Sequence, residues 1–167
     1  MRDTVIRHAR ESDLPALLAI YNHYVLNTHI TFDVEPRTPE QRRDWLKSLA
    51  ETGRHQCFVA EEEGQAVGWA SSGRFKDRAA YDTSVETSVY LAPGAQGRGL
   101  GRRLYAVLFA ALAKEDVHRA FGGIALPNEA SAGLHLAMGF VLCGTYREVG
   151  RKFGRFWDVA WYQRAMD

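Results

Sequence analysis

The feature that most constrains this chain is a strand, a glycine-rich turn and a helix that follow one another within residues 84–114. Residues 84–91 are mostly β-branched, aromatic or small polar, which predicts a strand that ends before Pro93 and Gly94. From Leu100 to Leu112, apolar residues recur every three or four positions, which predicts a helix with one buried face. A strand that feeds directly into a helix is typical of a mixed α/β domain.

The turn itself carries three alternate glycines, Gly97, Gly99 and Gly101. Glycines at a strand-to-helix turn let backbone N–H groups approach a ligand closely, and the positive end of the helix dipole then favours a phosphate or pyrophosphate. The spacing differs from the dinucleotide fingerprint, because Arg102 occupies the place of its third glycine, and it lacks the Gly-Lys-Ser/Thr ending of a nucleotide-triphosphate loop. An ordinary glycine-rich connection remains the alternative.

The rest of the chain predicts one α/β domain over residues 1–167, with helices packed on both faces of a sheet. A helix starts at Leu14 after the capping candidates of residues 11–13, and a second one starts after Thr38 and ends near Gly53. A third follows at residues 130–138. Further strands are predicted at residues 4–8, 56–61, 66–72, 119–126, 141–147 and 156–162, with a hairpin turn at 62–65.

Composition excludes several classes of function. The formal net charge is only +1 and no long basic run occurs, so no nucleic-acid partner is expected. No apolar run is long enough to span a bilayer, so no membrane partner is expected either. Cys57 and Cys143 lack metal or redox spacing, so we expect no metal and interpret both as buried, reduced thiols of a cytoplasmic protein.

Two motifs together resemble the GNAT N-acetyltransferases. Gln96, Gly99 and Gly101 match the Gln/Arg-x-x-Gly-x-Gly/Ala loop that holds the coenzyme A pyrophosphate, and residues 128–140 match the family's Asn-x-x-Ala/Ser-x-x-Leu-Tyr-x-x-x-Gly-Phe segment. The whole chain is similar to the branch that acetylates phosphinothricin and methionine sulfoximine, through residues 22–24, 31–32, 80–82, 86, 89–90, 126–128 and 158–159.

The resemblance implies a GNAT fold, a central, mostly antiparallel mixed sheet of about seven strands flanked by helices and splayed open for coenzyme A. It also implies acetyl-CoA as cosubstrate and a homodimer. The residues that it assigns to the coenzyme lie on the strand end, the turn and the later helix start: Val89, Tyr90, Leu91, Gln96, Gly97, Arg98, Gly99, Leu100, Gly101, Arg102 and Asn128. Asn128 is equally suited to cap the helix that follows it.

Glu86 is the candidate general base. Acetyl transfer needs a neutral amine, and a carboxylate that reaches the amine directly or through one water lowers the cost of removing its proton. Glu86 lies on the strand before the coenzyme loop and matches the glutamate to which the family assigns this role. The alternative is a surface carboxylate paired to an arginine, which contributes little.

His135 stands where most relatives carry the tyrosine that protonates the leaving thiolate. Imidazole is able to serve as this acid, but a helix histidine between Leu134 and Leu136 is equally suited to packing. Trp157 is a second departure, because a histidine commonly precedes the Asp158-Val159 pair in this branch. Any role of that histidine is therefore absent here.

The expected acceptor site combines a cationic loop with aromatic walls. Guanidinium groups bind carboxylates in a bidentate manner, so the loop is expected to hold an anionic amino-acid-like molecule. A solvated basic turn is the alternative. The assigned residues are Phe32, Arg74, Phe75, Lys76, Arg78 and Tyr81, together with Glu86.

These observations predict an enzyme that transfers acetyl from acetyl-CoA to a small-molecule amine by direct attack, with no covalent enzyme intermediate. Methionine sulfoximine or phosphinothricin is the leading candidate for the acceptor. A protein or peptide N-terminal acetyltransferase, with an open, groove-like cleft, is one alternative. A non-catalytic acyl-CoA-binding regulatory module is another.

Overall fold

Seven strands form one sheet in the computed structural model, which describes residues 3–166. Every neighbouring pair is antiparallel except β4 and β5, so the predicted mixed, mostly antiparallel sheet is confirmed. Across the sheet the strands are β1 (Thr4–His8), β2 (Cys57–Glu62), β3 (Gln65–Arg74), β4 (Ser84–Leu91), β5 (Arg119–Ala125), β7 (Arg155–Ala165) and β6 (Val141–Lys152).

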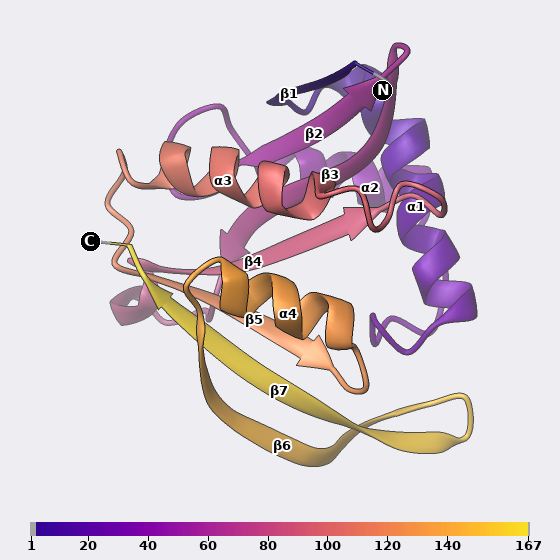
Figure 1. Ribbon diagram of the computed structural model, residues 1–167, viewed down its shortest axis with the longest axis vertical. Coiled ribbons are helices and arrows are strands. Elements are labelled where there is room, and N and C mark those ends of the chain that lie inside the picture. The colour runs from indigo at the N-terminus through magenta and orange to yellow at the C-terminus, as the bar shows by residue number, and fades with distance from the viewer. Residues whose placement is uncertain (1–2, 167) are drawn as a thin grey trace.

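Helices cover both faces of this sheet (Figure 1). Helices α1 (Leu14–Asn27) and α2 (Pro39–Lys47) lie on one face, and α3 (Leu100–Leu112) and α4 (Glu129–Ala137) on the other. Short 3-10 turns occur at Glu11–Asp13 and Ala79–Tyr81.

The two layers arise from the two-residue period of the strands. On β2, Phe58 and Ala60 join the core under α3, whereas Cys57 and Val59 join the core under α1. Full burial of a large apolar side chain stabilises the fold by about 1.5–3 kcal/mol relative to an exposed one.

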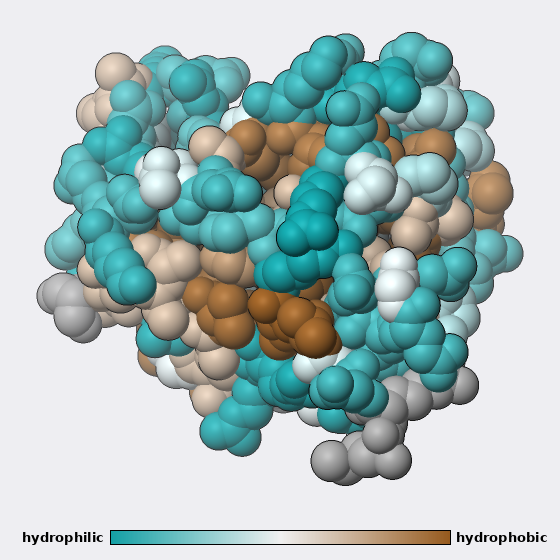
Figure 2. All heavy atoms as spheres, turned by 90° about the horizontal axis from the view of Figure 1, so that it is seen from above, coloured by the Kyte–Doolittle hydropathy of each residue, from teal (hydrophilic) through white to brown (hydrophobic). Residues whose placement is uncertain are grey.

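The surface of the molecule is largely polar. In the view of Figure 2, apolar side chains lie mostly in recessed patches between polar ones.

The sheet opens between β4 and β5. Their parallel ladder consists of three pairs, and the last one joins Glu86 to Phe121. Beyond this point β5 continues to pair with β7 as far as Ala125, while β4 follows β3 to Leu91. After Glu86, the edge of β4 that faces β5 therefore has no neighbouring strand among the residues that the structure describes.

The long β6–β7 hairpin leans against the connection between α1 and α2. Lys152 donates from Nζ to the carbonyl oxygen of Thr31 at 2.8 Å. A Cβ at Gly150 would lie 2.1 Å from the ring of Phe32, so this contact requires glycine. The ring of Trp157 stacks on His29, with centroids 4.2 Å apart. Trp157 thus supports this junction.

Several predicted details are wrong. Helix α2 ends at Lys47 rather than near Gly53, because Ser48 closes its last turn by donating from Oγ to the carbonyl of Trp45. Asp13 does not cap α1 through its side chain, because its carboxylate binds Arg7 and the backbone N–H of Arg10 instead.

The C-terminal region also differs from the prediction. Strand β6 extends to Lys152, and β7 covers Arg155–Ala165, so the connecting turn is much shorter than expected. Cys143 is exposed rather than buried, because it lies at an irregularity in the ladder of the edge strand β6. Cys57 is buried, as expected.

The cap of α2 yields the first testable prediction. The side chain of Thr38 accepts a hydrogen bond from the N–H of Gln41, and the side-chain oxygen of Gln41 accepts one from the N–H of Thr38. We expect Thr38→Ala to lower the free energy of unfolding by about 1 kcal/mol, measured by urea denaturation. Thr52→Ala, at an exposed position, is the control. Equal stabilities of the two variants would contradict the capping role.

Candidate active site

A cavity of about 790 Å³ lies on the α1–α2 side of the sheet, next to the opening between β4 and β5. Pockets of this size suit small ligands. Its walls come from α1, the α1–α2 connection, α2, strands β3, β4 and β5, and the β6–β7 hairpin. The lining residues are Tyr21, Ile30, Thr31, Phe32, Asp33, Arg37, Gln41, Arg42, Trp45, Trp69, Ser71, Glu86, Ser88, Tyr90, Gly123, Ala125, Tyr146, Val149, Val159 and Trp161.

Glu86 presents a carboxylate to this cavity. Burial raises the pKa of Glu86 above the usual range of a glutamate. Within residues 3–166 the carboxylate has neither an ion pair nor a side-chain hydrogen bond, so the alternative of a surface pair with arginine finds no support. A desolvated carboxylate without a partner is suited to take a proton from a bound amine.

Alternate residues of β3 and β4 form rows on the floor of the cavity. Trp69 lies opposite Tyr90, Ser71 opposite Ser88, and Gly73 opposite Glu86. The two serines therefore separate an aromatic end of the floor from the end that carries Glu86.

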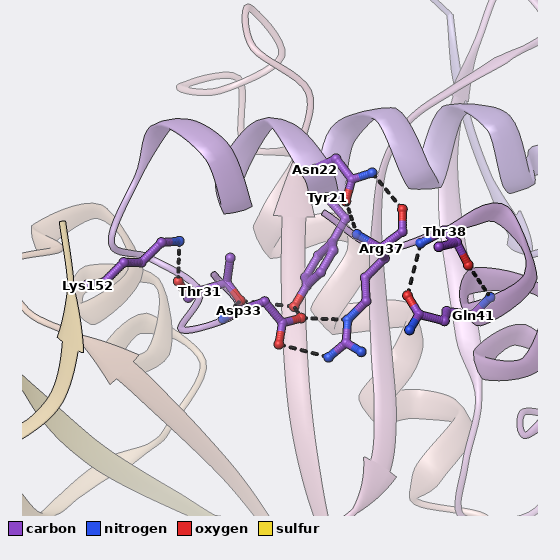
Figure 3. A network of polar contacts seen from close by, with 8 residues as sticks. All are labelled: Tyr21, Asn22, Thr31, Asp33, Arg37, Thr38, Gln41 and Lys152. Carbon is purple, nitrogen blue, oxygen red and sulfur yellow. Dashed lines mark hydrogen bonds and ion pairs between the residues drawn. The ribbon is translucent and has the colours of Figure 1, made fainter. Parts of the chain in front are cut away.

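A polar network forms one wall (Figure 3). Arg37 donates from Nε and Nη2 to the two carboxylate oxygens of Asp33, both at 2.8 Å, and Tyr21 donates to Asp33 at 2.6 Å. Burial alone would raise the pKa of Asp33, but the hydrogen bonds from Arg37 and Tyr21 outweigh it and lower this pKa. Asp33 is therefore ionised and its charge is balanced by Arg37.

Arg42 lies deeper in the same cavity. Its side chain rests on the rings of Trp45 and Trp69, at 3.6 and 4.6 Å from their centroids, and only 6% of the residue is exposed. Neither Arg37 nor Arg42 was singled out from the sequence, because both read as ordinary polar residues around the start of α2.

The predicted coenzyme loop precedes α3. Gly97 and Gly99 have φ values of +72° and +76°, which favour glycine. Gly99 is the N-cap of α3, and no side chain within residues 3–166 caps the helix, so its first-turn N–H groups are available to a ligand. These open donors fit a diphosphate.

Some side chains around this loop already form hydrogen bonds or ion pairs within the protein, and others do not. Gln96 donates to the hydroxyl of Tyr24 at 2.8 Å, and Tyr24 in turn donates to the carbonyl of Leu91 at 2.6 Å.

The two arginines near the loop differ. Arg98 pairs with the buried carboxylate of Glu62. Arg102 is exposed and has no hydrogen bond or ion pair in the described part of the chain. Leu100 and Gly101 are buried and support the helix from inside.

Asn128 caps α4 by accepting from the N–H of Ser131 at 3.2 Å, which confirms its capping role. It borders a separate, open depression rather than the main cavity. Its role toward the coenzyme stays a prediction.

His135 is buried in the core, with 3% exposed, and does not line the cavity. Its Nδ1 lies 2.8 Å from the carbonyl oxygen of Ser131, which requires Nδ1 to donate, so Nε2 accepts from Tyr105 at 3.2 Å. Burial lowers the pKa of His135. Its ring covers Gly122, where a Cβ would lie 2.6 Å from Nε2. This geometry favours the packing role over the acid role.

The cationic loop lies outside the cavity lining. Arg74, Lys76, Arg78 and Tyr81 are exposed, and Phe75 stacks on Phe121 with centroids 4.2 Å apart. Of the side chains assigned to the acceptor, the structure thus brings only Phe32 and Glu86 together in this cavity.

Two further findings concern metals and membranes. Among residues 3–166, no three His, Cys, Asp or Glu side chains are grouped so as to hold a metal ion. None of the helices described within the same range combines the length and the apolar character that a membrane crossing needs.

The splayed sheet, the open start of α3 and the cavity beside them agree with the layout expected of a GNAT acetyltransferase. An "Acetyltransferase (GNAT) domain" family matches residues 6–161. The chain therefore belongs to the GNAT acetyltransferase family and is an N-acetyltransferase.

Two relatives within this family are named for their amino-acid-like substrates. A phosphinothricin N-acetyltransferase of Streptomyces coelicolor is 58% identical over 163 residues, which cover 96% of this chain and 95% of that protein. An L-methionine sulfoximine/L-methionine sulfone acetyltransferase of Pseudomonas aeruginosa is 34% identical over 162 residues, with 97% and 94% covered.

Solved structures agree with this assignment. A phosphinothricin acetyltransferase of Sinorhizobium meliloti in complex with AcCoA matches with a TM-score of 0.92 and 31% identity, over 97% of this chain and 88% of that one. A ribosomal-protein-alanine N-acetyltransferase of Brucella melitensis matches with a TM-score of 0.90 and 43% identity, over 96% and 99%.

The raised pKa of Glu86 predicts a stability effect. A carboxyl group whose pKa is raised in the folded state favours folding while protonated, and this contribution is lost as the pH rises from the unfolded pKa through the folded one. We expect Glu86→Gln to be more stable than the wild type at pH 7–8, with the difference vanishing below about pH 4. Thermal unfolding across pH measures this.

Glu51→Gln, at an exposed position, controls for the loss of one negative charge. A Glu86→Gln variant that is no more stable than the wild type at pH 8 would contradict the desolvation of Glu86.

Proposed function

We propose that this protein transfers an acetyl group from acetyl-CoA to the α-amine of a small amino-acid-like molecule, with phosphinothricin or methionine sulfoximine as the leading acceptor. The observation that carries this proposal is the unpaired, desolvated carboxylate of Glu86 in a cavity of small-molecule size beside the opening between β4 and β5. The named activities of the relatives support the same acceptor class.

Acetyl-CoA supplies the acetyl group as a reactive thioester. The first-turn N–H groups of α3 hold its diphosphate, and Arg102 adds charge, because Arg98 is already neutralised by Glu62. The open edge of β4 after Glu86 offers backbone groups of Val89 to Leu91 to the pantetheine arm.

Glu86 then accepts a proton from the ammonium group of the acceptor, directly or through a water. For an α-amine with a pKa of about 8, deprotonation at pH 7 costs only about 1.4 kcal/mol. The neutral nitrogen attacks the acetyl carbonyl carbon, the carbon–sulfur bond breaks, and the departing thiolate takes up the second proton that the nitrogen loses as the amide forms. A thiol pKa near 8.5 makes this departure feasible without a dedicated acid, which agrees with the enclosed position of His135.

A second candidate is acetylation of a peptide N-terminus, which the similarity to the ribosomal-protein-alanine N-acetyltransferase favours. The two candidates differ in acceptor size. Rates of thiol release with free phosphinothricin and with a peptide that begins with alanine decide between them.

We also propose that the protein is a cytoplasmic homodimer without a metal. On the β6–β7 hairpin, six large apolar side chains are each more than half exposed: Val141, Leu142, Tyr146, Val149, Phe153 and Phe156. Such a patch is typical of an interface. Tyr146 and Val149 also line the cavity, so a partner on this hairpin would lie close to the acceptor.

The role of Glu86 predicts a kinetic effect. We expect Glu86→Gln to lower kcat by roughly 10²- to 10⁴-fold with little change in the KM for acetyl-CoA, because only proton removal is lost. In the wild type, kcat/KM should fall as the pH drops through the raised pKa of Glu86, and the variant should lack this limb. Thiol release measures both.

Glu51→Gln is again the matched control. An unchanged kcat in Glu86→Gln would remove Glu86 as the base. A non-catalytic acyl-CoA-binding module would instead bind acetyl-CoA but release no thiol with any amine.

The arginines near α3 predict a difference in coenzyme binding. We expect Arg102→Gln to lower the affinity for acetyl-CoA by roughly 3- to 10-fold, because the substitution removes a free positive charge beside the diphosphate. Arg103→Gln is the control, since Arg103 donates to the carbonyl of Thr4 instead. Calorimetric titration measures both affinities, and equal losses would contradict the assignment.

A further inference from the structure

Arg42 is a charged side chain of the cavity lining that has no role in the proposed reaction. It lies on α2, and its guanidinium carbon lies over the rings of Trp45, Trp69 and Tyr21, at 3.6, 4.6 and 5.1 Å from their centroids. Aromatic rings attract the positive charge of the group but accept no strong hydrogen bond from its N–H groups.

The nitrogens of Arg42 confirm this. Nε and Nη2 are buried and have no hydrogen-bond partner within residues 3–166. No carboxylate in that range pairs with Arg42, and burial lowers its pKa to about 10. A buried guanidinium without an acceptor is costly, and a ligand that supplies acceptors would offset this cost.

The other arginine in the cavity lining differs from Arg42. Both carboxylate oxygens of Asp33 accept hydrogen bonds from Arg37, so this arginine is already neutralised. Lys152 donates to the carbonyl of Thr31 and does not line the cavity. Arg42 thus remains as the cavity cation whose donors are unused within the described residues.

Arg42 and Glu86 lie at different ends of the cavity floor. Arg42 rests on Trp69, which pairs with Tyr90, and Glu86 lies four residues before Tyr90 on the same strand. Four residues of a strand span about 13 Å. An amine held at Glu86 keeps its own α-carboxylate near that end, so only the far end of the acceptor's side chain extends toward Arg42.

We propose that Arg42 binds the oxygen atoms of the acceptor's side-chain terminus, a tetrahedral phosphorus or sulfur group, while Glu86 binds the amine. This inference rests on the proposed function and refines its substrate class to amino acids with an oxygen-bearing tail. A phosphinate gains two charge-assisted contacts with the guanidinium, whereas a thioether offers no comparable acceptor.

The test compares acceptors of similar shape with an increasing hydrogen-bonding capacity of the tail: methionine, methionine sulfone and phosphinothricin. In the wild type, kcat/KM should rise along this series. In Arg42→Gln, kcat/KM should fall roughly 10- to 100-fold for phosphinothricin and less than threefold for methionine. An equal loss for all three acceptors would overturn the proposal, because it would show a structural role.

An acceptor without the α-carboxylate separates the two possible anions. With (3-aminopropyl)methylphosphinate, the loss caused by Arg42→Gln should persist. If the loss disappears with this compound, Arg42 binds the α-carboxylate and the tail assignment is wrong.

Arg43→Gln is the matched control, because Arg43 is next to Arg42 but pairs with Glu11 outside the cavity. It should leave the acceptor preference unchanged. Arg42→Lys keeps the charge without the planar fork, and it should retain part of the preference for phosphinothricin over methionine. Should Arg42→Gln fail to fold, Arg42→Lys decides, and an unaltered preference in that variant counts against the proposal.

Binding measurements separate this inference from the proposed function. Phosphinothricin should bind the coenzyme A complex of the wild type at least tenfold more tightly than that of Arg42→Gln in calorimetric titration. If no amino acid is acetylated but the wild type still binds phosphinothricin more tightly than Arg42→Gln, the proposed function is wrong and the role of Arg42 stands. If phosphinothricin is acetylated but binds both proteins equally tightly, the role of Arg42 is wrong.

Discussion

The divergence of β4 and β5 after Glu86 is the constraint on which the rest of the structure depends. The parallel ladder stops at Glu86, because β5 keeps its partner β7 while β4 stays with β3. On the edge of β4 that faces β5, backbone donors and acceptors beyond Glu86 thus have no strand partner in the described part of the chain, next to the open N-terminus of α3. The same opening brings a carboxylate to the edge of a cavity.

The charges around this cavity follow a simple arrangement. Asp33 and Arg37 neutralise each other. This leaves the carboxylate of Glu86 and the guanidinium of Arg42, at separate positions on the floor, without an ion-pair partner among residues 3–166. A zwitterionic or bipolar amino acid complements such a pair. The desolvation that makes each group costly to the fold also strengthens its interaction with a ligand.

The family and the main elements could be predicted from the chain alone because their signals are local. The glycines before α3, the capping box at Thr38 and the alternation on β2 each depend on neighbouring residues. Predictions that depend on distant contacts were less successful. Cys143 is exposed at the sheet edge, and His135 is enclosed by Tyr105 and Gly122, which belong to other elements.

The sequence by itself therefore determined the order of elements, the coenzyme-type turn and the position of Glu86 on its strand, since each follows from backbone preference or side-chain period. Only the tertiary structure decided which cations line the cavity. Arg42 is separated from Trp69 and Glu86 by long stretches of chain, and only the packing of α2 against α1 and Trp69 brings them to one cavity. No local sequence pattern indicates whether an arginine will form an ion pair with a carboxylate inside the cavity.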